Sequence, residues 1–368
     1  MTKEKKFKKR KLWQKIIICL LLIILIIALV FSALIGYLTL TEFNPDKEVP
    51  LKLTGKSQTN FVNKSIEMTA VSWNIGYGAI GSDADFFMDG GKSVDTADKD
   101  GVKKNLKGIS SELNSLNPDF ILLQEVDTDA KRSSYINEAS KLQNELLNQD
   151  YQSSFAENFK VKFIPYPIPP IGKVNAGIMT LSKSKISEAT RVQLPCPFKW
   201  PTRVANLKRC LSINRLPIEG SDKELVIVNL HLEAYDDGDG KKAQAEMLRK
   251  YLQAEADKGN YVIAGGDFNQ TFSGTDTSII KQFNGTWKPP VLDMDKFDKS
   301  WQFLMDTKTA SCRSLDKPLT SLNTNKFQFY IIDGFIVSSN IEVTSLETKQ
   351  MGFKNTDHNP VVLKFKLK

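Results

Sequence analysis

The hydrophobic pattern of the chain opens with one uninterrupted apolar run. Residues 16–41 contain no charged side chain over 26 positions. A helix rises about 1.5 Å per residue, so roughly 20 apolar residues cross the hydrocarbon core of a membrane. The run therefore predicts a transmembrane helix. The alternative is a cleaved secretory signal, but its apolar part is expected to span only about 7–15 residues. A retained anchor is the favoured interpretation.

After residue 65 the pattern changes to short apolar runs that alternate with amphipathic stretches. Val102, Leu106, Ile109 and Leu113 recur at helical spacing and predict a helix that ends at residues 117–119. A second helix is expected over residues 243–256. Compact apolar runs predict strands at 68–75, 120–126, 176–181, 210–216, 225–232, 261–265, 329–337 and 361–367. This is an α/β pattern in one domain covering residues 66–368.

The segments outside this domain complete the organisation. Residues 42–65 contain Pro45 and Pro50 and lack a clear period, which predicts a stalk between membrane and domain. Residues 1–15 hold eight basic side chains against one acidic one and are expected to form a basic cytoplasmic tail. Lysine-rich flanks remain cytoplasmic. The prediction is a single-pass protein of the cell membrane with its large domain outside the cell.

Charge has to be divided in the same way before it is interpreted. The whole chain carries a net charge of +8, from 50 basic and 42 acidic residues. Because residues 1–15 account for +7 of this, the remainder is close to neutral. Proteins that bind a nucleic-acid duplex obtain much of their affinity from lysine and arginine. The overall basicity is therefore no argument for nucleic-acid binding by the domain.

The four cysteines give little information about disulfides or metal binding. Cys19 lies in the apolar run, which leaves Cys196, Cys210 and Cys312 outside it. Cys196 and Cys210 are near enough in sequence to form a disulfide, and the spacing leaves open whether they do. No CxxC metal pattern is present. The sequence indicates no protein partner.

Polar residues stand where several of the predicted strands end. Asn74, Glu125, His231 and Asp267 each lie at or just after such an end. Loops at strand ends commonly carry catalytic groups on a rigid scaffold. Each residue also has a plain interpretation as a solvated turn or a structural histidine, and only their combination makes a functional site the better hypothesis.

Two further positions add to this combination. Asp333 lies inside an apolar strand, where a carboxylate is costly to bury unless it is paired. The chain has only two histidines, His231 and His358. A histidine held by the carboxylate of Asp333 is the simplest proposal for its partner.

Six short motifs occur in an order that resembles the endonuclease/exonuclease/phosphatase superfamily, in particular its deoxyribonuclease I-like members. The motifs are Trp73-Asn74, Gln124-Glu125-Val126, Asn229-Leu230-His231-Leu232, Gly266-Asp267-Phe268-Asn269, Ile332-Asp333 and Asp357-His358-Asn359-Pro360. Each is weak alone, but together they cover residues 68–368. The resemblance implies a four-layer αββα sandwich of two mixed, mainly antiparallel sheets. Thr356 stands where the family usually has a serine, which keeps a hydroxyl.

The resemblance also implies roles. Metal-dependent hydrolysis of a phosphodiester is expected, with Mg²⁺ as the cofactor and Mn²⁺ or Ca²⁺ as alternatives. A hard cation prefers oxygen ligands. The expected metal ligands are Asn74, Glu125 and Asp357. The expected catalytic residues are His231, Asp267, Asn269, Asp333 and His358. Of these, Asp267 would orient or deprotonate water, His231 would donate to a phosphate oxygen, and Asp333 would hold His358.

Two residues are weaker candidates for substrate binding. Arg132 follows Glu125 closely enough to reach a phosphate, and Asn175 precedes a predicted strand. An arginine on a loop is more often simply solvated, and the same applies to Arg203 and Arg209.

The sequence supports three alternative functions, two of which differ in the substrate. The first is hydrolysis of nucleic acid, on the resemblance to nucleases. The second is hydrolysis of a phospholipid or inositol phosphate, favoured by the anchor and by the apolar, proline-rich residues 163–171, which also suit a rigid segment covering the core. The third is a binding protein that has lost catalysis, which the eight filled motif positions disfavour. Residues 76–101 hold six aspartates and predict a solvated loop that would repel a polyanion if it overhangs the site.

Overall fold

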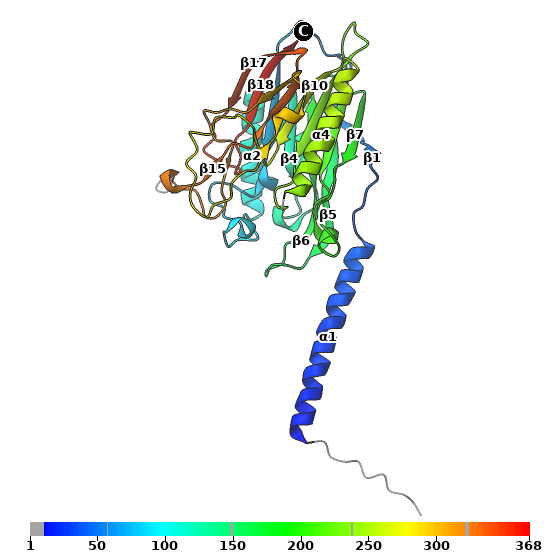
Figure 1. The fold of residues 1–368 in the computed structure, drawn as a ribbon, viewed down its shortest axis with the longest axis vertical. Helices are drawn as coiled ribbons and strands as arrows, with labels where there is room; N and C mark the ends of the chain where they lie inside the picture. The colour runs from blue at the N-terminus through cyan, green and yellow to red at the C-terminus, as the bar shows by residue number, and fades with distance from the viewer. Residues whose placement is uncertain (1–10, 57, 148–149, 237, 321–323) are drawn as a thin grey trace, which may run out of the picture.

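The fold is described from a computed structural model that covers residues 11–56, 58–147, 150–236, 238–320 and 324–368. Residues 1–10, which make up most of the expected basic tail, lie outside the described residues. Figure 1 shows a layered domain from which one long helix, α1 (Leu12–Leu40), projects, while the C-terminus lies at the far end.

Two seven-stranded sheets form the centre of the domain. The first sheet, in spatial order, contains β1 (Glu48–Pro50), β7 (Glu188–Gln193), β8 (Cys210–Pro217), β9 (Glu224–His231), β10 (Tyr261–Asp267), β16 (Asp333–Ser338) and β13 (Trp301–Leu304). The second contains β17 (Ile341–Thr348), β18 (Val361–Leu367), β3 (Met68–Asn74), β4 (Phe120–Asp127), β6 (Gly172–Ser182), β5 (Gln152–Ile164) and β2 (Leu53–Gly55). Within these two sheets, as far as the structure describes them, only the pairs β9–β10 and β3–β4 are parallel.

Shorter elements connect the sheets. Two small ladders pair β11 (Thr271–Phe272) with β12 (Val291–Leu292), and β14 (Cys312–Arg313) with β15 (Phe329–Tyr330). The helices are α2 (Lys99–Leu116), α3 (Glu138–Lys141), which runs into a π-helical turn (Leu142–Leu146), and α4 (Asp239–Asp257). The part of the chain that the structure describes also has 3₁₀ turns at Gly76–Gly78, Phe87–Asp89, Lys131–Ser133, Thr202–Ala205, Met294–Lys296 and Thr324–Lys326.

Alternation along the strands builds the four layers. Successive side chains of a strand point to opposite faces of its sheet. In β4, Ile121 and Leu123 pack against α2, whereas Phe120 and Leu122 pack between the sheets. On the first sheet the outer face packs against α4. The four-layer αββα sandwich expected from the sequence is confirmed, and its sheets are mixed and mainly antiparallel.

The segment expected to be a stalk belongs to the sheets instead. Residues 48–50 pair with β7 at the edge of one sheet, and residues 53–55 pair with β5 at the edge of the other. Val62 is fully buried and bridges to Ile218. Edge strands this short carry too little hydrophobic pattern to be visible in the sequence. The chain therefore joins the domain within a few residues of the end of α1.

The remaining differences from the sequence expectations are local. The strands β5, β7, β13 and β17 were not expected, and the strand predicted at 329–337 is divided into β15 and β16. Cys196 and Cys210 are both free thiols, so the open question of a disulfide is answered by two separate cysteines.

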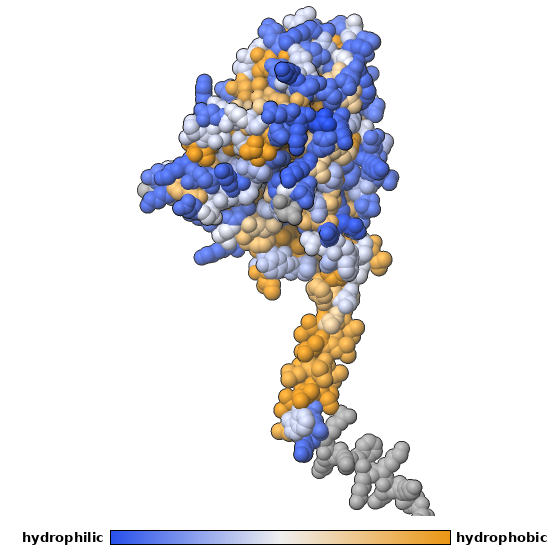
Figure 2. All heavy atoms as spheres, in the orientation of Figure 1, coloured by the Kyte–Doolittle hydropathy of each residue, from blue (hydrophilic) through white to orange (hydrophobic). Residues whose placement is uncertain are grey.

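Helix α1 is exposed along most of its length. Figure 2 shows apolar atoms over most of the visible surface of this helix, with hydrophilic residues at its lower end. Among the described residues it is the one helix long and apolar enough to cross a membrane, and a signal sequence has the same properties.

Candidate active site

The polar strand ends identified in the sequence meet at one edge of the sandwich. β3 and β4 are parallel and in register, with Asn74 beside Gln124, so Asn74 and Glu125 leave their strands at the same end. In the other sheet, Asp267 is the partner of both His231 on β9 and Asp333 on β16. The topology thus places these residues together without help from the loops.

A glycine explains how Asp267 reaches this position. Gly266 has φ of 155°, and a Cβ atom there would lie 1.9 Å from the carbonyl oxygen of Leu230. Only glycine allows β9 and β10 to approach this closely. Asn269 has φ of 50°, which asparagine tolerates better than most residues. Its side chain donates to the Leu232 carbonyl at 3.0 Å, and its backbone N–H donates to Asp267 at 2.9 Å.

Glu125 is presented by an irregularity of β4. The pairing between β4 and β6 shifts after Leu123, and Glu125 takes φ of 54° in the resulting bulge. Bulges redirect side chains near functional sites, and a left-handed conformation at a residue other than glycine is strained. The Glu125 carboxylate accepts a hydrogen bond from the Asn74 amide at 3.2 Å.

His358 and Asp333 form the pair expected from the sequence. The imidazole Nδ1 of His358 lies 2.8 Å from Asp333 Oδ2, and both side chains are almost completely buried. The Trp73 indole donates to the His358 carbonyl oxygen at 2.9 Å, which fixes the backbone of this segment. Burial lowers the pKa of His358, but the carboxylate of Asp333, the Cys312 thiol and Asp357 outweigh it and hold that pKa well above its usual range.

Asp267 lies between the two histidines. Its Oδ2 atom is 3.4 Å from His231 Nε2 and 3.8 Å from His358 Nε2, and it accepts from the Asn74 amide at 3.1 Å. Burial, and then the charge of Asp333, raise the pKa of Asp267 to about 7. One buried carboxylate therefore faces two imidazoles and exchanges a proton near neutral pH.

The two histidines differ in their electrostatics. Burial, followed by the positive charges of Arg209 and His358, lowers the pKa of His231 well below its usual range. Its Nδ1 is buried without a hydrogen-bond partner. His231 is thus held as a neutral imidazole, while His358 favours the imidazolium form.

The oxygen ligands suit a divalent cation. Burial, and next the nearby carboxylate of Asp357, raise the pKa of Glu125, because two negative charges share one buried region. Arg132, whose positive charge acts on Glu125, forms its hydrogen bonds with Asp127 and not with Glu125. The carboxylates of Glu125 and Asp357 are ligands of the kind that Mg²⁺ prefers. The side chain of Asn74 lies beside Glu125, and its amide oxygen accepts from the Gly76 N–H at 3.0 Å. These residues fit such a cation, because its positive charge would neutralise the two neighbouring carboxylates.

Two other groups of potential ligand atoms lie within 4.8 Å of one another. One is Asp267 with Asp333 and His358, and the other is Cys312 with Asp357 and His358. In the first group, Asp333 and His358 already bind each other, and the second includes a thiol, which a hard cation does not favour. Both groups therefore match a hydrogen-bonded catalytic cluster better than a separate magnesium site.

Arg132 is held by a neighbour. Its guanidinium binds both carboxylate oxygens of Asp127, at 2.8 and 3.1 Å, and lies 3.8 Å above the Tyr77 ring. The backbone N–H of Asp127 in turn donates to Glu138, which is fully buried. This layer beneath Glu125 was not visible in the sequence, because nothing in the helical pattern around Glu138 indicates burial.

Arg209 and Asn175 lie at the sides of the cluster. Arg209 is 3% exposed, and its Nε is 3.8 Å from Glu233 Oε2. Two of its guanidinium nitrogens are buried without a hydrogen-bond partner. Asn175 lies on β6, where its carbonyl oxygen accepts from the Thr128 N–H at 2.8 Å and its side-chain oxygen is buried and unpaired.

Two exposed residues, Tyr235 and Asp89, lie beside the cluster, and we call this region the mouth. The Tyr235 hydroxyl is 3.5 Å from the carboxylate of Asp89, in the acidic segment 76–101. Reduced hydration beside Tyr235, followed by the charges of Asp357 and Glu125, raises the pKa of Asp89 to about 7. The acidic segment therefore places a carboxyl group next to the site that carries only part of a negative charge near neutral pH.

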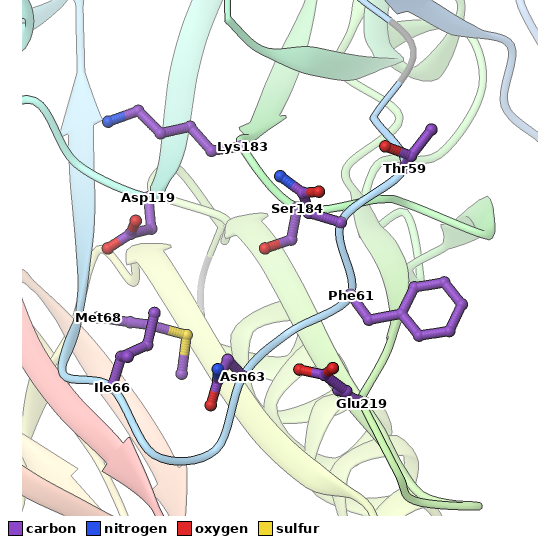
Figure 3. A pocket seen from close by; sticks show the side chains of 10 residues that line it. Thr59, Phe61, Asn63, Ile66, Met68, Asp119, Lys183, Ser184 and Glu219 are labelled. Carbon is purple, nitrogen blue, oxygen red and sulfur yellow. The ribbon is translucent and has the colours of Figure 1, made fainter.

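A separate hollow of about 560 Å³ lies at the opposite end of the sandwich (Figure 3). It lies beside the starts of β3 and β4, whereas the cluster lies at their ends. Two of its charged side chains have partners: Asp119 accepts from the Thr69 N–H at 2.8 Å, and Lys183 donates to Asn117. This hollow contains none of the catalytic candidates.

Comparison with known proteins agrees with this arrangement. Residues 71–317 match the model of the endonuclease/exonuclease/phosphatase family. The chain belongs to this family. The matched range includes Asn74, Glu125, His231 and Asp267, and the structure adds Asp333 and His358 from beyond it. No curated protein matches the chain in sequence.

Solved structures share the fold at low sequence identity. An endonuclease/exonuclease/phosphatase from Beutenbergia cavernae superposes with a TM-score of 0.56 and 17% identity, over 82% of this chain and 72% of its own. The human Nocturnin catalytic domain gives 0.50 and 17%, over 86% and 98%. ANGEL2, a 2',3'-cyclic phosphatase, gives 0.52 and 14%, over 87% and 99%. The family contains hydrolases of phosphoester bonds, which typically use divalent metal ions.

Proposed function

We propose that this chain is a metal-dependent phosphoesterase that cleaves a phosphodiester by direct attack of water on phosphorus. The observation that supports it most is the convergence of Asp267, His231 and the His358–Asp333 pair from separate segments of the chain, with 2.8–3.8 Å between their polar atoms. A buried acid, a neutral imidazole and a charged imidazole at one point supply the proton donors and acceptors of such a reaction.

In this proposal each residue has one role. The Asp267 carboxylate orients the attacking water and accepts its proton, and Asn269 fixes Asp267 through its backbone N–H. His231 donates its N–H to a phosphate oxygen. His358 stabilises negative charge in the transition state, and Asp333 keeps it charged and oriented.

Glu125, Asp357 and Asn74 would hold the divalent cation. When bound, the cation neutralises charge on the phosphoryl oxygens. Arg132, from the 3₁₀ turn after β4, and Asn175, from β6, are proposed to approach the substrate. Arg132 would do so with the part of its guanidinium that Asp127 does not occupy.

We further propose that α1 is a retained membrane anchor. Its apolar surface is exposed on all sides, and the domain follows it directly. Basic residues before the helix favour a cytoplasmic N-terminus and place the catalytic domain outside the cell. The domain boundaries at residues 16, 42 and 66 remain predictions, with the qualification that residues 48–55 pair with the sheets.

Nucleic acid is the first candidate substrate, on the resemblance to nucleases. A phospholipid or another phosphate ester is the second, and one observation favours it: the domain outside the basic tail is nearly neutral and carries the aspartate-rich segment 76–101. A polyanion gains little from such a surface.

The decisive experiment presents the full-length protein, purified in detergent, to plasmid DNA, RNA, sphingomyelin and inositol phosphates in parallel. Each substrate is tested with Mg²⁺ and with a chelator. Hydrolysis of at least one substrate with Mg²⁺, and its loss in His231→Ala, Asp267→Ala and His358→Ala, is expected. The surface variant Asp298→Ala is the control and should retain activity. Wild-type turnover by His358→Ala would refute the assigned roles.

A further inference from the structure

We propose that the domain rests on the outer leaflet of the bilayer through an apolar rim, and that this contact turns the mouth toward phosphate esters carried by lipids. The rim consists of Phe163, Tyr166, Ile168 and Trp200. The inference rests on the proposed anchor and phosphoesterase activity, and it adds a docking surface and a substrate class.

The rim is exposed although it is apolar. Tyr166 is 71% exposed, Ile168 94%, Trp200 58% and Phe163 39%. Tyr166 and Ile168 lie on the connection between β5 and β6, Phe163 lies at the end of β5, and Trp200 precedes the 3₁₀ turn Thr202–Ala205. In Figure 1 the β5–β6 connection extends below the domain beside the upper end of α1, and Figure 2 shows apolar atoms there. Adjacent exposed apolar side chains of this size mark an interaction surface.

Direct contacts hold this part of the domain against the end of α1. Leu38 of the helix forms a buried cluster with Val161 of β5 and Val204. The Trp200 indole donates to the Thr39 hydroxyl at 3.1 Å. The rim is therefore attached to the helix by packing, and its height relative to the helix is fixed.

An ion-pair network strengthens the attachment. The Glu42 carboxylate, just after the helix, accepts from Arg203 at 3.0 and 3.3 Å and lies 2.9 Å from Lys208 Nζ. Glu42 and Lys208 are both largely buried. A partly buried network of this kind favours one orientation of the domain over free rotation about a stalk.

The length of the helix places this junction at the membrane surface. Roughly 20 residues cross the hydrocarbon core, so a span that starts at Ile16 ends near Ile35. Leu38 lies about one turn further on, in the headgroup region. The side chains that pack beside Leu38 then lie at the level of the lipid headgroups. The β5–β6 connection, which extends from them toward the apolar part of the helix, lies at the same level.

The bilayer is the occupant that suits the rim, because the rim continues the surface of a membrane-spanning helix. Its composition is also appropriate: tyrosine and tryptophan concentrate at the membrane interface. Lys162 and Lys199 are exposed, and each directly precedes a rim residue, Phe163 and Trp200 respectively. Cations at this level are attracted to anionic lipids.

The mouth opens at the same edge of the sandwich as the rim. Asp127, at the end of β4, pairs with Ala176, close to Gly172, where β6 leaves the connection that carries the rim. Lys131 Nζ donates to the Pro170 carbonyl oxygen at 3.2 Å, which joins the segment after Glu125 to this connection. When the rim touches the membrane, the end of β4 that carries Glu125 therefore faces it.

The acidic segment is joined to the rim as well. The Phe87 ring packs edge-on against Tyr166, with centroids 6.3 Å apart, and Asp89 follows two residues later at the mouth. Rim and mouth thus share one structural unit. A phosphate ester in a lipid headgroup lies within reach of this arrangement, whereas a long nucleic-acid duplex would have to enter between the domain and the membrane.

Site-specific fluorescence tests the docking surface. The full-length chain is inserted into vesicles of phosphatidylcholine and phosphatidylglycerol in a Cys19→Ser, Cys196→Ser background, since Cys210 and Cys312 are buried. A single polarity-sensitive label is attached to Ile168→Cys. The matched control is Ile66→Cys, an exposed isoleucine (51%) beside the hollow of Figure 3 at the opposite end.

Nitroxide-labelled lipids are expected to quench the label at position 168 strongly and the label at position 66 weakly. Equal quenching at the two positions overturns the docking surface. This measurement does not depend on any enzymatic activity.

Hydrolysis measurements test the substrate class separately. With the same vesicles, Ile168→Asp is expected to lower the hydrolysis of vesicle phospholipid about tenfold, because a charge replaces an inserted apolar group. Hydrolysis of soluble bis(4-nitrophenyl) phosphate should be unchanged, as in the control Ile66→Asp. Failure on the soluble ester in the wild type refutes the phosphoesterase itself. Cleavage of DNA or RNA without any phospholipid hydrolysis refutes the lipid substrate.

Discussion

The substitution Asp333→Asn removes one charge from the site with almost no change in shape. Asp333 Oδ2 lies 2.8 Å from His358 Nδ1, and the two side chains are 1% and 5% exposed. Asparagine can still accept a hydrogen bond there, but it no longer stabilises an imidazolium. The Ser311 hydroxyl accepts from the backbone N–H groups of Ile332 and Asp333 at 3.0 and 3.1 Å, so the local backbone should keep its path.

The size of the effect follows from the type of contact that is lost. A hydrogen bond involving a charged group contributes about 1.5–3 kcal/mol in proteins. If His358 stabilises the transition state as an imidazolium, this energy is lost there, and about 1.4 kcal/mol corresponds to a factor of ten in rate. The expected decrease in kcat is therefore about 10- to 100-fold, with KM changed much less.

The assay is steady-state hydrolysis of bis(4-nitrophenyl) phosphate with Mg²⁺ by the full-length protein, with thermal unfolding measured on the same samples. Asp298→Asn makes the same chemical change at an exposed aspartate and should leave kcat unaltered. A variant Asp333→Asn that folds normally and retains more than half of the wild-type kcat would refute the argument. A double variant with His358→Gln should be no worse than His358→Gln alone, since both remove one interaction.

Three further predictions concern the metal, the core and the surface. Glu125→Gln should raise the Mg²⁺ concentration for half-maximal activity at least tenfold; an unchanged value would remove Glu125 from the metal site. Asn229→Ala should lower the free energy of unfolding by about 2–4 kcal/mol in urea titrations, because the Asn229 amide joins the sheets by donating to the carbonyls of Leu123 and Met179 at 3.1 and 3.0 Å. A loss below 1 kcal/mol would contradict this. Against the effect of burial, hydrogen bonds from Arg215, Lys258 and Asn260 lower the pKa of Glu255 to about 2. Its charge therefore stabilises the fold above about pH 4.5 and is lost as the pH falls toward 2. With allowance for solvent screening, Glu255→Gln should cost about 1–2 kcal/mol at pH 7 and nothing near pH 2; an equal cost at both pH values would refute the linkage.

The motif around His231 illustrates how far the sequence could lead. Its position at the end of an apolar strand made it a catalytic candidate, and the structure places it 3.4 Å from Asp267. In the same motif, Asn229 had no assigned role. It is fully buried and binds carbonyls of the opposite sheet, a contact between residues about 50 and 106 positions apart. No local pattern records such a partner.

The sequence by itself determined the helices and strands that depend only on residues close together in the chain. Apolar periodicity predicted α2, α4 and most central strands, and a run without charges predicted α1. Because a buried carboxylate needs a partner, the sequence also linked Asp333 to a histidine.

Only the tertiary structure decided what depends on distant neighbours. Edge strands such as β1 and β2 exist because another strand offers hydrogen bonds to a short segment without a pattern of its own. The pKa values of Asp267 and His358 depend on charges brought together from separate strands. The common edge of mouth and rim follows from strand register, which hydrogen bonding between strands sets and no single segment encodes.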